Sequence, residues 1–166
     1  MSEAKAEYYN RRGVALEKKR SLAKAIEQFT LAISINVRYA EAYFNRGEVY
    51  QSMLKFDLAI SDFTDAIGLS PNFVQAYYRR GNCHHQRSEY SQARSDYSAA
   101  IKLDPHHAWA YYERAKVHRL LGEESLANND LTIAYSLGSG DPDAYWPESG
   151  RLLAHSGHPF AFNPAA

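Results

Sequence analysis

Residues 40–73 read AEAYFNRGEVYQSMLKFDLAISDFTDAIGLSPNF, and residues 74–107 read VQAYYRRGNCHHQRSEYSQARSDYSAAIKLDPHH. The two segments are 34 residues long and share one pattern. In each, a glycine follows a tyrosine by four residues, two alanines flank a bulky aromatic residue, and a proline stands near the end. Self-similarity at such a period indicates an array of small structural repeats.

The pattern extends to both sides of these segments, so that five rows of residues recur at intervals of 34. The tyrosine row is Tyr9, Tyr43, Tyr77, Tyr111 and Tyr145, and the glycine row is Gly13, Gly47, Gly81 and Ala115. The alanine rows are Ala25, Ala59, Ala93 and Ala127, and Ala32, Ala66, Ala100 and Ala134. The bulky row between them is Phe29, Phe63, Tyr97 and Leu131. The chain therefore contains four repeats, 6–39, 40–73, 74–107 and 108–141.

The second half of each repeat has helical spacing. Ala25, Ile26, Phe29, Ala32 and Ile33 fall on one face of a helix with 3.6 residues per turn. A second helix, which carries the tyrosine and the glycine, precedes each of these segments. Polar residues typical of turns separate the two, and a proline that cannot continue a helix closes repeats 2 and 3. Each repeat is therefore predicted to be a helical hairpin.

The small and large rows suggest how the hairpins pack. A glycine inside a helix costs roughly 0.5–1 kcal/mol relative to alanine, so a repeated glycine requires a reason. We expect the glycine row to face the alanine row of the partner helix, where the helices approach closely. The bulky row is expected to fill the wider gap between successive hairpins. No hairpin buries its faces alone, so the repeats are predicted to fold as a stack.

Composition limits the class of protein. The 166 residues carry 19 basic and 19 acidic side chains, and the net charge of zero argues against a nucleic-acid partner. A hydrophobic share of 45% suits an ordered soluble protein, and no apolar run is long enough for a membrane span or a signal peptide. The single cysteine, Cys83, favours a reducing compartment. We therefore expect a cytoplasmic location and no membrane partner.

The sequence offers no persuasive catalytic set, and we predict that the protein is not an enzyme. Cys83 occupies a position that is small and apolar in the other repeats, which indicates an inert thiol. His84 and His118 occupy a predicted packing row, and neither a cysteine nor a carboxylate joins them at metal-ligand spacing. No glycine-rich phosphate loop is present, because the glycines are spaced by the repeat. No catalytic residue, metal or cofactor is predicted.

These rows resemble the tetratricopeptide repeat (TPR) family over residues 6–141. The resemblance implies an all-α right-handed superhelix of four stacked helical hairpins. A lead of residues 1–5 precedes the array, and a C-terminal capping helix over 142–157 and a tail over 158–166 follow it. Tyrosine takes the place usually held by tryptophan, and Ala115 replaces a glycine.

The resemblance also implies a function. In this family the first helix of each hairpin lines a concave groove, and stacked repeats use such grooves to bind partners. The groove positions with aromatic, amide or basic side chains are predicted to bind the partner. They are Asn10, Phe44, Asn45, Tyr78, Arg79, Asn82, Trp109, Tyr112 and Lys116. Aromatic and arginine side chains dominate binding hot spots, and amides can bond a peptide backbone. We therefore predict a protein-interaction scaffold that binds a peptide or a partner surface.

Three other functions are weighed against this one. The array could instead be an assembly adaptor that binds a filament or a second copy of itself. Clamps for acidic chaperone C-termini fit poorly, because only Asn45 and Arg79 match and both lysines of the clamp are missing. RNA binding also fits poorly, because Glu41, Glu48 and Glu113 accompany the basic groove residues.

Overall fold

The computed structural model describes residues 2–138. The predicted capping helix and tail lie outside the described residues. The chain divides into two compact units, an N-terminal unit over Met1–Pro105 and a C-terminal unit over His106–Ala166. The helices of the N-terminal unit are α1 (Ser2–Lys18), α2 (Leu22–Ile35), α3 (Ala40–Ser52), α4 (Phe56–Leu69), α5 (Val74–Gln86) and α6 (Tyr90–Leu103). In the C-terminal unit, the described helices are α7 (Ala108–Leu120) and α8 (Glu124–Leu137).

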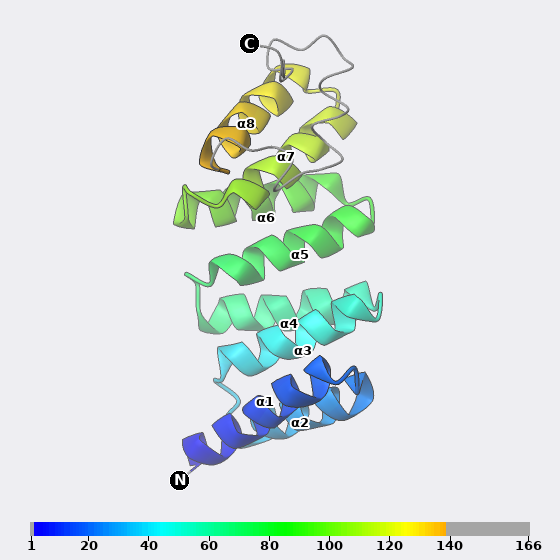
Figure 1. Ribbon diagram of the computed structural model, residues 1–166, viewed down its shortest axis with the longest axis vertical. Helices are drawn as coiled ribbons and strands as arrows, with labels where there is room; N and C mark the ends of the chain where they lie inside the picture. Colours follow the sequence, from blue (N-terminus) through cyan, green and yellow to red (C-terminus); the bar gives the residue numbers. More distant parts are fainter. Residues whose placement is uncertain (1, 139–166) are drawn as a thin grey trace, which may run out of the picture. The chain divides into compact units, whose positions relative to one another are not determined.

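Each repeat forms one helical hairpin, as predicted. The pairs are α1–α2, α3–α4 and α5–α6 in the N-terminal unit, and α7–α8 in the C-terminal unit (Figure 1). In the N-terminal unit α2 packs on α3, and α4 packs on α5, so the three hairpins stack in chain order. The first helix starts at Ser2, which makes most of the predicted lead a part of α1. The prediction of an all-α fold is confirmed for the described residues.

The predicted role of the glycine row is wrong. A Cβ atom added to Gly47 would lie 2.8 Å from Cε1 of Phe63, and one added to Gly81 would lie 2.8 Å from Cε1 of Tyr97. Each glycine therefore makes room for the aromatic ring of its own hairpin, and not for the alanine row. The reason is that a ring needs more space than a methyl group, and removing the facing Cβ provides it.

Phe29 and Phe63 of the bulky row pack against the next hairpin, as predicted. Phe29 is fully buried and packs with Val49, which belongs to α3 of the next hairpin. In the C-terminal unit the smaller pair Ala115 and Leu131 replaces the combination of glycine and aromatic ring. Ala115 has the Cβ that a glycine lacks, and Leu131 on the facing helix is smaller than the aromatic residue it replaces.

The turn inside each hairpin contains one residue in the left-handed backbone region. The φ angles are 61° at Arg20, 59° at Leu54, 60° at Ser88 and 77° at Gly122. These four residues are 34 apart, so the turn geometry repeats with the fold. Only repeat 4 has the residue type that adopts this conformation without steric cost.

Replacing Ser88 with glycine is expected to stabilise the N-terminal unit by about 0.5–1 kcal/mol. A left-handed residue other than glycine costs about 1–2 kcal/mol, and the greater unfolded-state entropy of glycine offsets part of the gain. Urea denaturation followed by circular dichroism measures the difference. Gly122→Ala is the matched reverse change and should destabilise. A lower denaturation midpoint for Ser88→Gly would contradict the strain argument.

Candidate functional site

The predicted groove residues of the N-terminal unit lie on three neighbouring helices. They are Asn10 on α1, Phe44 and Asn45 on α3, and Tyr78, Arg79 and Asn82 on α5. The helix α3 contacts both α1 and α5, so the first helices of the hairpins form one layer. We call the side chains at these six positions, together with Glu17 and Glu48, the first-helix surface.

The side chain of Asn10 is largely engaged in hydrogen bonds within the fold. Its side chain is buried, and its Nδ2 donates a hydrogen bond of 3.2 Å to the hydroxyl of Tyr39. Its Oδ1 accepts a bond of 2.9 Å from Nδ2 of Asn45. The tyrosine lies between α2 and α3, and burial raises its pKa, although the bond to Asn10 opposes this. The chain of three polar groups therefore joins the first and second hairpins.

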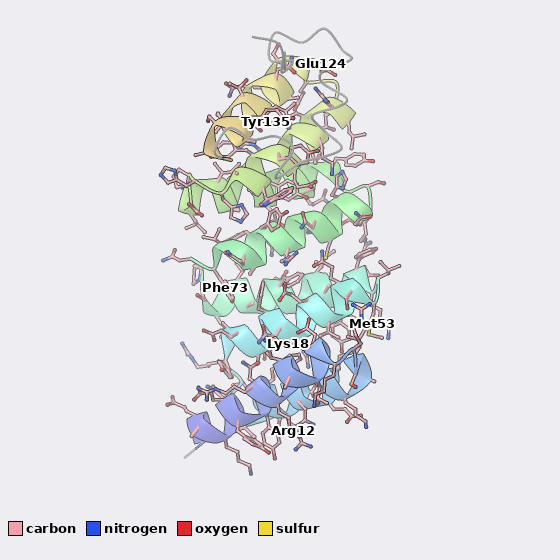
Figure 2. All side chains as sticks on the ribbon, in the orientation of Figure 1. Arg12, Lys18, Met53, Phe73, Glu124 and Tyr135 are labelled. Atoms are coloured by element: carbon pink, nitrogen blue, oxygen red, sulfur yellow. The ribbon has the colours of Figure 1, made fainter. Side chains whose placement is uncertain are left out.

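Phe44 is also partly structural. Its ring centroid lies 5.6 Å from that of Phe63 and 4.7 Å from that of Phe73, which stands at the start of α5 (Figure 2). The side chain is half-buried and packs against the cluster that contains Ala59 and Cys83. The structure thus places Phe44 between the second and third hairpins, where its main contacts are with the core.

Tyr78 and Arg79 are both partly exposed and contact each other on the first-helix surface. The guanidinium carbon of Arg79 lies 5.9 Å from the ring centroid of Tyr78, within the range of a cation–π contact. Arg79 also pairs with Glu48 of α3 at 3.0 Å, and its side chain is 41% exposed. The nearby Asn82 accepts a 2.8 Å hydrogen bond from the hydroxyl of the buried Tyr97. Tyr78 also packs on Tyr97, with ring centroids 6.0 Å apart, so Arg79 is the residue of the three with the most evident surface for a partner.

Carboxylates give this surface mixed charge. Burial raises the pKa of Glu17, the charge of Glu48 raises it further, and Lys18 lowers it. Glu48 is in turn paired with Arg79. The sequence analysis selected neither Glu17 nor Glu48 as a binding residue. The structure shows that burial and the charge of Glu48 both disfavour ionisation of Glu17.

The C-terminal unit carries the three remaining predicted residues on α7. The rings of Trp109 and Tyr112 meet edge to face, with centroids 5.9 Å apart. The ammonium of Lys116 lies 5.8 Å from the Tyr112 centroid and pairs with Glu113 at 2.8 Å. Trp109 is 38% exposed, whereas Tyr112 packs against the core cluster of Ala115 and Leu131. The three predicted residues are therefore close together on one helix.

A buried ion-pair row was missed by the sequence analysis. In three repeats an arginine of the first helix donates two hydrogen bonds to an aspartate of the second helix, with distances of 2.7–2.9 Å. The pairs are Arg46–Asp62, Arg80–Asp96 and Arg114–Asp130. Each arginine also lies within 5.5–5.8 Å of the ring of a row tyrosine: Tyr43, Tyr77 or Tyr111. The constant spacing of these arginines and aspartates was the available signal.

The two histidines of the packing row join this network. Nδ1 of His84 lies 2.6 Å from Glu89, and Nδ1 of His118 lies 2.5 Å from Glu123. Their Nε2 atoms lie 3.8 Å from Asp96 and 3.6 Å from Asp130, respectively. The bond from His84 lowers the pKa of Glu89, and Arg87 adds to this effect. These histidines therefore hold the turn of their own hairpin.

Residues 2–138 bear on metal, thiol and membrane chemistry as well. In that range no set of three or more His, Cys, Asp or Glu side chains is arranged to hold a metal ion. The thiol of Cys83 is buried, and burial raises its pKa to about 12, which leaves it protonated and unreactive. No helix in this part of the chain has the length and apolar character needed to cross a membrane.

Solved structures share this fold. A crystal structure of MamA has 22% identity and a TM-score of 0.78, over 81% of this chain and 78% of that chain. An Arabidopsis OM64 TPR domain has 27% identity and a TM-score of 0.69, over 72% of this chain and 98% of that chain. The first TPR of Spaghetti (RPAP3), bound to the HSP90 peptide SRMEEVD, has 26% identity and a TM-score of 0.71, over 72% of this chain and 95% of that chain.

The family comparison agrees with the helical pairing. Among curated protein sequences no match was found. Residues 40–73 and 74–107 match one tetratricopeptide repeat profile, and residues 6–36 match a second profile of the same family. The windows coincide with the hairpins α3–α4, α5–α6 and α1–α2. The chain is therefore an all-α member of the tetratricopeptide repeat family.

Proposed function

We propose that the protein is a non-enzymatic interaction scaffold that binds a peptide or a partner surface across its first-helix surface. TPR arrays are a protein-interaction fold, which supports the class of function. The observation that carries the site is Arg79, whose side chain is 41% exposed and whose guanidinium carbon lies 5.9 Å from the ring centroid of Tyr78. An arginine held in place by an aromatic ring loses less freedom on binding, and both residue types are common in hot spots.

The partner's chemistry differs from that of the chaperone clamps. The first TPR of Spaghetti (RPAP3) binds an HSP90 peptide that ends in two glutamates, a valine and an aspartate. At the two positions where the clamp pattern described above has lysines, this chain has Asn10 and Gln75, and the side chain of Asn10 is bonded to Tyr39 and Asn45. We therefore propose a partner that is not held by its C-terminal carboxylate. A cytoplasmic location is part of the proposal, for which the single cysteine is the support.

The double variant Tyr78→Ser, Arg79→Gln is expected to lose at least about tenfold in partner affinity, because hot-spot truncations cost about 2 kcal/mol or more. Phe44 is left unchanged in this variant, because its ring packs against Phe63 and Phe73. Affinity capture from the native lysate, compared with Lys102→Gln on the exposed part of α6, measures the effect. Circular dichroism checks that both variants fold.

The same experiment separates the scaffold from the alternative of an assembly adaptor. Partners captured equally by the double variant and by wild type would disprove binding at the first-helix surface. Sedimentation equilibrium over a range of concentrations tests self-association, and co-sedimentation with candidate filaments tests filament binding. A monomer that captures partners only with Tyr78 and Arg79 intact supports the scaffold.

A further inference from the structure

The first hairpin carries three basic residues in one stripe along α1. They are Lys5 and Arg12 on the helix and Lys19 directly after its last residue, and Arg12 is labelled in Figure 2. Because they are seven residues apart, they lie on the same side of the helix, about 10 Å from one another along its axis. Tyr8 and Ala15 stand between them on that side. We call these five exposed residues the end face.

In the next two hairpins the residues at these positions receive the preceding hairpin. The residues in place of Ala15 are Val49 and Cys83, which are fully buried against Phe29 and Phe63 of the hairpin before. Those in place of Tyr8 are alanines 42 and 76, which are also fully buried, whereas Tyr8 is 59% exposed. The end face is therefore the surface on which a helix packs elsewhere in the N-terminal unit.

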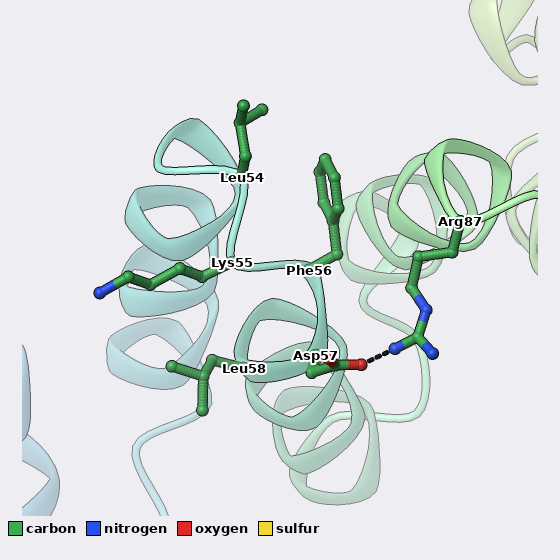
Figure 3. A pocket seen from close by; sticks show the side chains of 6 residues that line it. All are labelled: Leu54, Lys55, Phe56, Asp57, Leu58 and Arg87. Atoms are coloured by element: carbon green, nitrogen blue, oxygen red, sulfur yellow. Dashed lines mark ion pairs between the residues drawn. The ribbon is translucent and has the colours of Figure 1, made fainter.

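The packing of α4 on α5 shows which polar contacts such a helix makes. Nη1 of Arg80 donates a 2.9 Å hydrogen bond to the hydroxyl of Thr64, and Arg87 pairs with Asp57 (Figure 3). The start of α4 thus meets the end of α5, so the two helices run antiparallel. The two acceptors on α4 are seven residues apart, as are the two arginines. This face therefore binds acceptors that recur every seven residues.

The charges of the end face are not compensated. Within residues 2–138, Lys5, Arg12 and Lys19 take part in no ion pair. In the other three repeats an arginine at the position of Arg12 pairs with a buried aspartate of its own hairpin, but Gln28 stands at that aspartate's position. The Oε1 atom of Gln28 is buried and accepts no hydrogen bond from the described residues. Arg12 therefore keeps its guanidinium available.

The sign of the charge indicates the occupant. A terminal repeat needs a polar outer face for solubility, which charges of either sign provide. Here all three charged positions are basic, and no end-face position holds an acidic residue. Such a surface favours an anionic partner. The exposed ring of Tyr8 and the way α4 packs on α5 favour a helix over a nucleic acid.

We propose that the end face binds an amphipathic helix of a partner protein whose carboxylates recur every seven residues. The helix runs antiparallel to α1, and its carboxylates pair with Lys5, Arg12 and Lys19. Apolar side chains between the carboxylates cover Tyr8 and Ala15. The ion pairs set the register and the preference for acidic helices, and the apolar contact adds affinity. The end face is a docking site separate from Tyr78 and Arg79.

The test is a titration of the ¹⁵N-labelled full chain with designed helical peptides, followed by amide chemical shifts. The matched peptide is three copies of Glu-Ala-Gln-Leu-Ala-Ala-Gln, in which glutamate and leucine share one side of the helix. The moved peptide is three copies of Ala-Ala-Gln-Leu-Ala-Glu-Gln, which has the same composition but carries glutamate on the side opposite leucine. Both are acetylated and amidated. We expect saturable shifts at the five end-face residues with the matched peptide, and at least about threefold weaker binding of the moved peptide.

A triple variant tests the basic residues directly. Lys5→Gln, Arg12→Gln, Lys19→Gln changes only exposed side chains, so it is expected to fold, which circular dichroism checks. It should bind the matched peptide about three- to tenfold more weakly, because it removes three exposed ion pairs. Tyr78→Ser, Arg79→Gln should bind this peptide as wild type does, so failure of one docking site does not imply failure of the other.

A second triple variant is the matched control. Lys18→Gln, Lys24→Gln, Arg38→Gln removes the same charge from exposed positions outside the end face, and should bind within about twofold of wild type. Equal binding of the two peptides, or equal loss in the two triple variants, would overturn the proposal. So would end-face shifts on dilution of the free chain, which would identify a second copy as the occupant. Tighter binding of an oligouridylate at the same residues would identify a nucleic acid instead and would also overturn it.

Discussion

Replacing Arg46 with methionine is expected to lower the free energy of unfolding by about 3 kcal/mol at pH 7. The arginine donates hydrogen bonds of 2.8 and 2.7 Å to the two carboxylate oxygens of Asp62, whose side chain is only 5% exposed. It also donates a 3.0 Å bond to Thr30 of the preceding hairpin. Methionine keeps much of the packing volume but leaves a buried charge without its partner.

The loss should depend on pH in a defined direction. Burial raises the pKa of Asp62 above its ordinary value, the bonds and charge of Arg46 oppose this, and Asp65 raises it further. Removing Arg46 therefore raises this pKa more. A carboxyl whose pKa is higher in the folded state contributes stability at low pH and loses it as the pH rises through that pKa. The deficit of Arg46→Met relative to wild type should thus be smaller at pH 4 than at pH 7.

A more exposed ion pair of the N-terminal unit provides the control. Arg79 pairs with Glu48 at 3.0 Å, but its side chain is 41% exposed, so Arg79→Met should cost less than about 1 kcal/mol. Urea denaturation of both variants at pH 7 and pH 4 measures the free energies and the m-values. If Arg46→Met costs no more than Arg79→Met, the buried pair does not hold the second hairpin together.

The fold was predictable from the sequence because its information is local and repeated. Apolar residues at helical spacing place each second helix, and the fixed interval of 34 residues excludes most other arrangements. Hairpins that contact each other are neighbours in the sequence, so few long-range contacts had to be predicted. The observed helices accordingly coincide with the predicted hairpins from α2 to α8.

The contacts of individual side chains were less predictable. A residue type that recurs every 34 positions shows which face of a helix it lies on, but it does not show which side chain it contacts. Gly47 faces Phe63 and not the alanine row, since helix rotation decides this contact. Asn10 donates a hydrogen bond to Tyr39, a residue that belongs to none of the repeated rows. The role of the tyrosine row was within reach, however. Tyr43 precedes Arg46 by three residues, a spacing at which helical side chains meet.

Replacing Gly47 with alanine should also be strongly destabilising, by about 2 kcal/mol. Alanine favours helix over glycine by about 1 kcal/mol, so propensity alone predicts the opposite sign. The added Cβ would lie 2.8 Å from Cε1 of Phe63 and 3.0 Å from its Cδ1, which is too close for ordinary contact. Phe63 is fully buried, so its ring can move only by disturbing the core. Urea denaturation of the single variant measures the sign directly.

A double-mutant cycle shows whether the ring is the cause. Repeat 4 pairs Ala115 with Leu131, so Phe63→Leu in the Gly47→Ala background should remove the overlap and restore stability. The same Phe63→Leu change in wild type should destabilise, because it leaves an unfilled space beside Gly47. The two changes are therefore expected to couple favourably by about 1–2 kcal/mol. Additive effects would mean that the glycine is kept for a reason other than the ring. Coupling of the expected sign would establish that two packing solutions, glycine with an aromatic ring and alanine with leucine, are interchangeable within one repeat.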